Sequence, residues 1–148
     1  MSGDLLIGFA ISFLNFGIHA VMTALIVVTT RHIKSRTHYH GIFVRLAALL
    51  LITVSILMLA HIAEIAVWAG SLDFLGIKVA KVGTFEFAFE NYTALGYGDA
   101  LPANSAHRLI GPVMALNGLL LIGWSVAVIF EVMRMVEFEV APRSKRSG

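Results

Sequence analysis

Hydrophobic residues fill three long stretches of the chain, and a shorter apolar stretch lies between the second and the third. The long stretches cover approximately residues 5–30, 42–69 and 109–135. An α-helix rises about 1.5 Å per residue, so about 20 consecutive apolar residues cross the hydrocarbon core of a bilayer. The pattern therefore predicts three membrane-spanning helices.

The composition places the chain in a membrane. Of the 148 residues, 58% are hydrophobic and 14% are charged, whereas soluble domains carry roughly 25% charged residues. The mean hydropathy is +0.85. The first apolar stretch follows Asp4 rather than a basic segment and is longer than the core of a signal peptide, so we expect it to be a retained anchor. The absence of cysteine excludes disulfides and thiolate metal sites.

Basic residues cluster at one end of the predicted helices. Eight of the eleven Lys and Arg residues flank the first connection or follow the third apolar stretch: Arg31, Lys34, Arg36, Arg45, Arg134, Arg143, Lys145 and Arg146. Short loops rich in Lys and Arg favour the cytoplasmic side. We therefore expect a multi-pass protein of the cell membrane with its N-terminus outside, residues 71–107 outside and its C-terminus in the cytoplasm.

The shorter apolar stretch, residues 85–94, is too short to span. As a helix it would extend about 15 Å, half a bilayer, so it is predicted to enter the membrane and return. Thr84 is the expected N-cap, and Glu86 falls in the first turn, where a carboxylate suits the helix dipole. The partly negative C-terminal end of this helix would point into the membrane, toward a cation.

Residues 89–102 read FENYTALGYGDALP. Backbone that leaves a helix at membrane depth must be buried in protein or line a polar cavity. Gly96 and Gly98, at alternating positions, would let consecutive carbonyls turn to one side and form a column of oxygen ligands for a cation. One chain supplies one wall of such a column, so symmetric copies must supply the others. The sequence implies a homotetramer.

Residues 96–99 are Gly-Tyr-Gly-Asp. This tetrapeptide and the predicted helices on either side of it make residues 42–135 resemble the pore of the potassium channel family. The resemblance implies an all-α membrane fold in which an outer helix, a re-entrant pore helix, a selectivity-filter loop and an inner helix assemble as a tetramer. It implies that K+ binds to the backbone carbonyls of Ala94, Leu95, Gly96 and Tyr97. The filter as a whole would comprise Thr93, Ala94, Leu95, Gly96, Tyr97 and Gly98.

Further residues extend the resemblance. Glu90, nine residues before Asp99, matches a carboxylate pair that braces the filter in some two-helix bacterial members; the alternative is that Glu90 faces water in an outer vestibule. Pro102 and Arg108 also fall where that subgroup has Pro and Arg. Gly118 lies twenty residues after Gly98, at the hinge position of the inner helix.

The chain also departs from the family. Ala94 stands where a threonine hydroxyl usually helps to form the innermost ion site, so potassium selectivity is in question. Leu95 replaces the usual valine or isoleucine, and Glu86 and Phe87 replace an aromatic pair. The first helix lies outside the two-helix pattern and lacks the row of arginines that a voltage sensor needs.

The inner helix is expected to line the cavity. If Gly118 faces the axis, helical spacing brings Ile122, Val126 and Phe130 to roughly the same face, where apolar rings could gate by dewetting. The alternative is that this stripe packs against neighbouring helices. Near the inner end, Glu131 could attract cations, but we favour an ion pair with Arg134, one turn away.

Histidines offer two other constellations. His61 and Glu64 lie three residues apart on the second helix; they could form a proton-sensing pair or a metal site, but we expect them to hydrogen-bond to each other or to the pore helix. His32, His38 and His40 lie in the first connection, which we interpret as a basic, lipid-facing loop rather than a metal site.

The sequence thus predicts a passive potassium channel that needs no cofactor, with K+ as the permeant ion. Its expected partners are its own copies and membrane lipids; neither nucleic acid nor enzymatic activity is expected. The predicted segments are an N-terminal helix and loop (1–41), a pore domain (42–137) and a basic tail (138–148). The alternatives are a poorly selective monovalent cation channel and a non-conducting structural or regulatory membrane subunit.

Overall fold

The computed structural model describes residues 2–36, 41–96 and 100–140. They form an all-α fold, as predicted from the sequence. Its elements are α1 (Ser2–Arg36), α2 (Ile42–Phe74), α3 (Thr84–Tyr92), a short 3-10 helix η1 (Ser105–His107) and α4 (Ile110–Val140). The three long helices extend beyond the predicted spans, and α3 ends two residues earlier than predicted.

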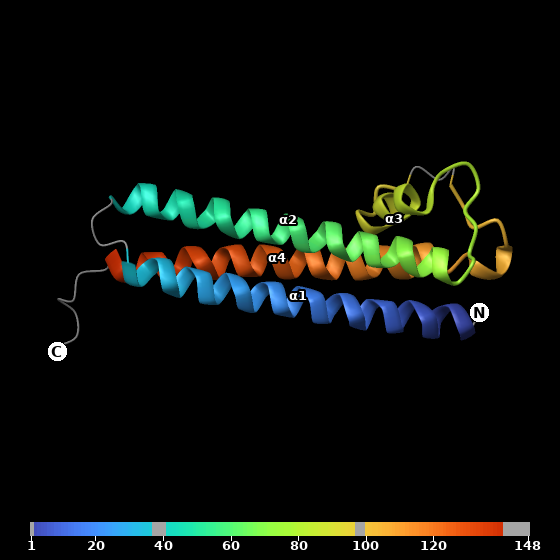
Figure 1. Cartoon of the computed structure of the whole chain (residues 1–148), viewed down its shortest axis with the longest axis horizontal. Coiled ribbons are helices and arrows are strands. Elements are labelled where there is room, and N and C mark those ends of the chain that lie inside the picture. Colours follow the sequence, from blue (N-terminus) through green and yellow to red (C-terminus); the bar gives the residue numbers. More distant parts are fainter. Residues whose placement is uncertain (1, 37–40, 97–99, 141–148) are drawn as a thin grey trace.

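The three long helices lie side by side, and α3 packs against α2 and α4 near one end (Figure 1). The N-terminus of α1 and the connection from α2 to α4 lie at that same end, and α4 ends at the opposite one (Figure 1). This is the arrangement of a chain that crosses three times, with α3 entering from the side on which the chain begins.

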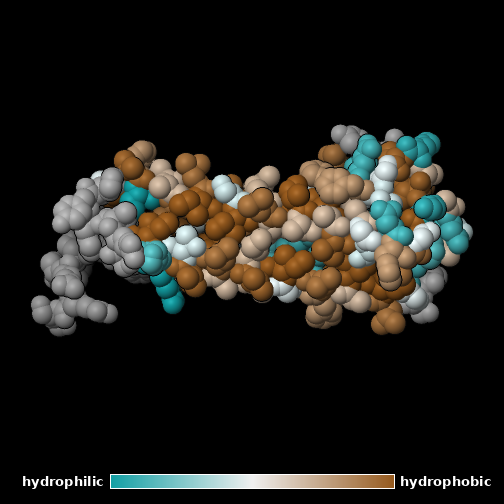
Figure 2. All heavy atoms as spheres, viewed as in Figure 1, coloured by the Kyte–Doolittle hydropathy of each residue, from teal (hydrophilic) through white to brown (hydrophobic). Residues whose placement is uncertain are grey.

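All three long helices are long and apolar enough to cross a membrane, over Gly3–Ile33, Ile42–Phe74 and Ser105–Met135. Apolar side chains cover the middle of the visible face, and hydrophilic ones gather at the end that carries α3 (Figure 2). Because the outer surface is apolar where a soluble protein would be polar, it suits lipid or further copies of the chain. The protein is a multi-pass membrane protein.

Two clusters of buried apolar side chains hold the helices together. The one near α3 includes Trp68, Phe87 and Met114, and the other, toward the opposite end, includes Ile26 and Val132. Small residues let the helices approach: a Cβ at Gly8 would lie 2.8 Å from a methyl group of Val113, so α1 and α4 are in close contact there.

The chain segments before and after α3 are joined by backbone hydrogen bonds. Val79 and Pro102 form an isolated antiparallel bridge. Its hydrogen bonds run from the Ala80 amide to the Leu101 carbonyl and from the Ala103 amide to the Lys78 carbonyl, each 2.9 Å. The bridge closes a loop that contains α3 and residues 93–96, the described part of the predicted filter segment (residues 93–98), so α3 is held relative to α2 and α4.

The start of α3 differs from the sequence prediction. Gly83, not Thr84, is the N-cap, and no side chain caps the helix. The Thr84 hydroxyl instead donates to the Asp73 carboxylate, 3.0 Å from each oxygen, because Asp73 at the end of α2 lies within its reach. Glu86 lies in the first turn of α3, as predicted.

Candidate functional site

α3 ends in a Schellman motif, and the chain then continues into the predicted filter segment. The Leu95 amide donates to the Glu90 carbonyl and the Ala94 amide to the Asn91 carbonyl, both at 2.9 Å. Such a cap requires a left-handed residue between its two bonds. Ala94 takes that conformation, with φ +56°, where glycine is the usual residue.

Left-handed conformations alternate along the segment that follows. Ala94 (φ +56°) and Gly96 (φ +52°) are left-handed, and Leu95 between them is not. Alternation of left-handed and right-handed residues turns successive amides to one side of the chain and carbonyls to the other. Residues 93–96 are exposed in the single chain. This segment is therefore accessible to a ligand or to another copy of the chain.

The rest of the predicted filter cannot be placed. Tyr97, Gly98 and Asp99 lie outside the described residues. The expected Glu90–Asp99 pair therefore stays a prediction, as does the assignment of the filter residues to ion sites.

Two glycines of α4 let it pass directly beneath α3. A Cβ at Gly111 would lie 2.7 Å from the Asn91 side-chain oxygen, and a Cβ at Gly118 would collide with the Tyr92 carbonyl. Asn91 is held in place by its own amide group, which donates to the Phe87 carbonyl at 2.8 Å. The contact with Tyr92 gives Gly118 a packing role; its predicted role as a hinge is untested.

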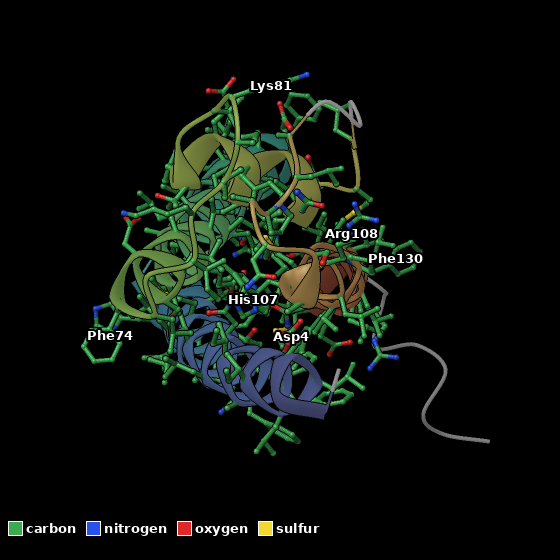
Figure 3. All side chains as sticks on the ribbon, turned by 90° about the vertical axis from the view of Figure 1, so that its right-hand side faces the viewer. Asp4, Phe74, Lys81, His107, Arg108 and Phe130 are labelled. Carbon is green, nitrogen blue, oxygen red and sulfur yellow. The ribbon has the colours of Figure 1, made fainter. Side chains whose placement is uncertain are left out.

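Gly118 differs in burial from the predicted gate residues Ile122, Val126 and Phe130. It is buried under α3, whereas Ile122, Val126 and Phe130 are exposed in the single chain, and Phe130 projects away from α1 and α2 (Figure 3). Four residues advance a helix by about 40° more than one turn, so the stripe drifts progressively off the face of Gly118. The expectation that Gly118 and these three residues share roughly one face, and their role in gating, therefore stay predictions.

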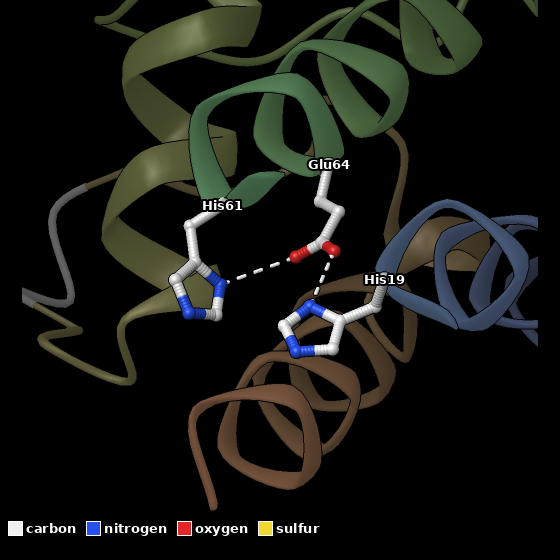
Figure 4. A group of neighbouring side chains, drawn as sticks. All are labelled: His19, His61 and Glu64. Carbon is white, nitrogen blue, oxygen red and sulfur yellow. Dashed lines mark hydrogen bonds and ion pairs between the residues drawn. The ribbon is translucent and has the colours of Figure 1, made fainter. Parts of the chain in front are cut away.

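A buried polar cluster joins all four helices directly behind the filter segment. Its centre is the Glu64 carboxylate of α2, which is fully buried. His19 Nδ1 of α1 lies 2.8 Å from one carboxylate oxygen, and His61 Nδ1 of α2 lies 3.1 Å from the other (Figure 4). The Tyr92 hydroxyl, at the end of α3, donates to the same oxygen as His61.

Ser125 of α4 closes this cluster on the far side of both imidazoles. Its hydroxyl oxygen lies 2.9 Å from His61 Nε2 and 3.4 Å from His19 Nε2. Each histidine therefore bridges Glu64 and Ser125, and the five side chains form a ring. Because polar groups in a membrane interior have no water to bond, such a ring holds helices together strongly.

A second polar group extends the connection between α1 and the pore helices. The Asn15 side-chain amide donates to the Glu64 backbone carbonyl at 3.2 Å and to the Asn117 side-chain oxygen at 3.1 Å. That oxygen also accepts from the Trp68 indole at 3.0 Å. At the end of the bundle, His107 Nδ1 lies 2.9 Å from the Asp4 carboxylate (Figure 3). The first helix is thus built into the bundle rather than loosely attached to it.

Several expectations about side-chain pairs are confirmed. His61 and Glu64 bond to each other and to Tyr92 of the pore helix, and Arg134 pairs with Glu131 at 3.1 Å. His38 and His40 lie outside the described residues. The sequence reasoning missed His19 and Asn15 as partners of Glu64. Their i, i+4 spacing, which puts two polar residues on one face of an apolar helix, was a signal of buried partners.

Comparison with known protein families agrees with this architecture. A family model described as an ion channel (Ion_trans_2) matches residues 51–135, which contain most of α2, all of α3, the filter segment and the start and middle of α4. No curated protein and no solved structure matches the chain significantly. The match covers more than half of the chain, so this protein belongs to the Ion_trans_2 family of ion channels.

Proposed function

We propose that four copies of this chain form a potassium-selective channel in which K+ passes down its gradient through a central filter. The observation that carries the proposal is the segment of residues 93–96, which is exposed and has left-handed residues at alternate positions, Ala94 and Gly96, at the C-terminal end of α3. Carbonyl oxygens presented this way replace the hydration shell of a monovalent cation.

The dipole of α3 supports the same conclusion. The C-terminal end of a helix carries partial negative charge because its last carbonyls lack helical partners. Here that end leads directly into the filter segment. A cation placed beside residues 93–96 therefore lies in a favourable field, whereas an anion does not.

The exposed face of α4 supports assembly around an axis. Val126 and Phe130 are 59% and 72% exposed in the single chain, on the side turned away from α1 and α2. We propose that this face lines the cavity of the tetramer, with Ile122, Val126 and Phe130 as its apolar constriction. The proposed orientation puts the N-terminus and residues 71–107 outside and the C-terminus in the cytoplasm.

The test is the reversal potential of the purified protein in planar bilayers, with K+ on one side and Na+ on the other. We expect a value close to the potassium limit. Gly96→Ala should abolish the current and leave the tetramer intact, because it adds a side chain in the filter at a left-handed position. Gly123→Ala, whose added Cβ meets no atom within 4 Å, is the matched control. Undiminished current through Gly96→Ala would reject the filter assignment.

A poorly selective cation channel is the second candidate, and Ala94 favours it. Alanine has no hydroxyl to complete the innermost ion site. If the pore is poorly selective, Ala94→Thr should move the reversal potential toward the potassium limit. An unchanged potential would count against this candidate. A chain that runs as a monomer or dimer in mild detergent would instead indicate a non-conducting subunit.

A further inference from the structure

We propose that His19, His61 and Glu64 form a binding site for a divalent transition-metal ion of the Zn²⁺ type. This site is distinct from the filter: its ligands lie inside the protomer, between α1 and α2 (Figure 4). One potential ligand atom from each of the three side chains lies within 4.8 Å of the others.

The ligand types suit such an ion. Two imidazoles and one carboxylate are a common protein ligand set for Zn²⁺, with the fourth position of a tetrahedron left open. Ligands about 2.0–2.1 Å from a tetrahedral ion stand roughly 3.3 Å apart. The carboxylate oxygens already stand 2.8 Å from His19 Nδ1 and 3.1 Å from His61 Nδ1. Small side-chain movements would admit the ion.

The groups around the three ligands are those that a metal site needs. A histidine that binds metal through one nitrogen usually donates its other N–H to an acceptor, which fixes the ring. Both Nε2 atoms face the Ser125 hydroxyl oxygen, whose two lone pairs can accept from both. The Tyr92 hydroxyl bonds to Glu64 and supports the carboxylate.

The charge of the cluster also calls for a cation. The side chains of His19 and Glu64 are 0% exposed. The side-chain partners of the Glu64 carboxylate are two histidines and a tyrosine. A buried carboxylate at this depth is costly unless it is paired. A divalent ion held between the carboxylate and both imidazoles supplies that pairing. In the single chain the His61 side chain is 17% exposed, so the site reaches the surface of the protomer there.

The experiment is a Co²⁺ titration of the full chain, purified in detergent without a histidine tag and followed by visible absorption. We expect the intense visible band of four-coordinate Co²⁺ to saturate at one ion per chain and to disappear when Zn²⁺ displaces Co²⁺. His19→Ala and Glu64→Gln should lose the band. His32→Ala, which changes an exposed histidine of α1 outside the cluster, should keep it.

A cysteine variant tests the site even if the alanine variant misfolds. The chain contains no cysteine. Co²⁺ bound by His19→Cys must therefore show a thiolate charge-transfer band that arises from position 19 alone. The proposal would be overturned by the absence of this band in a folded tetramer, by the absence of Co²⁺ binding to the unaltered chain, or by loss of the visible band in His32→Ala but not in His19→Ala.

Discussion

Ala94 holds a left-handed backbone conformation that alanine normally avoids. The conformation costs an L-residue roughly 1–2 kcal/mol because its Cβ approaches the following carbonyl oxygen. Ala94 accepts it because the Schellman bonds of Leu95 and Ala94 to the last turn of α3 require it. The local strain therefore lies at the junction between the pore helix and the filter segment.

Replacing Ala94 by glycine should relieve this strain. We expect Ala94→Gly to stabilise the fold by about 1 kcal/mol, since glycine is the preferred residue at this position of the cap. Ala88→Gly, in the buried interior of the same helix, should destabilise by a similar amount or more. Thermal unfolding of both variants in detergent measures the difference. Shifts of the same sign would contradict the conformational argument.

The Tyr92 hydroxyl connects the pore helix to the polar cluster. Tyr92→Phe removes a donor to the buried Glu64 carboxylate, so we expect a loss of about 1–3 kcal/mol in stability. Ser55→Ala is the control, because the Ser55 hydroxyl is exposed and bonds only to the Leu51 carbonyl of its own helix. Urea or thermal unfolding compares the two. Equal losses would mean that the bond to Glu64 contributes nothing specific.

At the scale of the elements, α4 supports α3 through direct contact of their backbones. Glycine at position 118 lets the Tyr92 carbonyl lie against α4. Because no side chain lies between the two backbones at this point, we expect the two helices to move together. The end of the pore helix therefore depends on the position of α4.

Gly118→Ala should separate the two helices. The new Cβ would collide with the Tyr92 carbonyl, and we expect a loss of about 1–3 kcal/mol or more, as for an overpacked core. Gly123→Ala on the same helix should be neutral or slightly stabilising, because its Cβ meets open space and alanine favours a helix. Thermal unfolding in detergent distinguishes them. A harmless Gly118→Ala would contradict the observed packing.

The hydrophobic pattern predicted the elements because each long span needs only its own apolar residues to be recognised. The prediction of Thr84 as the N-cap of α3 was wrong because its hydroxyl bonds to the Asp73 carboxylate, eleven residues away, instead of to the local backbone. The bonds from His19 to Glu64 and from Asn15 to Asn117 join positions far apart in the chain. The pairing of helix faces depends on packing in three dimensions, so a local sequence pattern does not predict it.

At the scale of the whole molecule, α1 is an integral part of the helix bundle although all of it precedes the residues that match the ion channel family. It supplies Asn15 and His19 to partners on α2 and α4, and Asp4 to His107. Without α1, the side of Glu64 and Asn117 that these residues cover would face lipid.

A chain that begins at residue 41 should therefore lose its fold. We expect little or no tetramer in size-exclusion chromatography, because buried polar groups would be exposed to hydrocarbon. Co-expression of residues 1–36 as a separate segment should restore assembly, since the α1 residues that contact the rest of the bundle, Asp4, Asn15 and His19, all lie within this segment. A stable tetramer formed by residues 41–148 alone would show that α1 is dispensable.

The position of Glu64 also bears on how the chain enters the membrane during synthesis. A carboxylate within a span opposes insertion, by up to about 3 kcal/mol when it lies at the centre, although the surrounding apolar residues of α2 outweigh it. The helix that carries its partners His19 and Asn15 is synthesised first. When α2 leaves the ribosome, α1 can already be in the bilayer with His19 and Asn15 on one face. The Glu64 carboxylate can then pass from the translocation channel directly to these partners without contacting lipid.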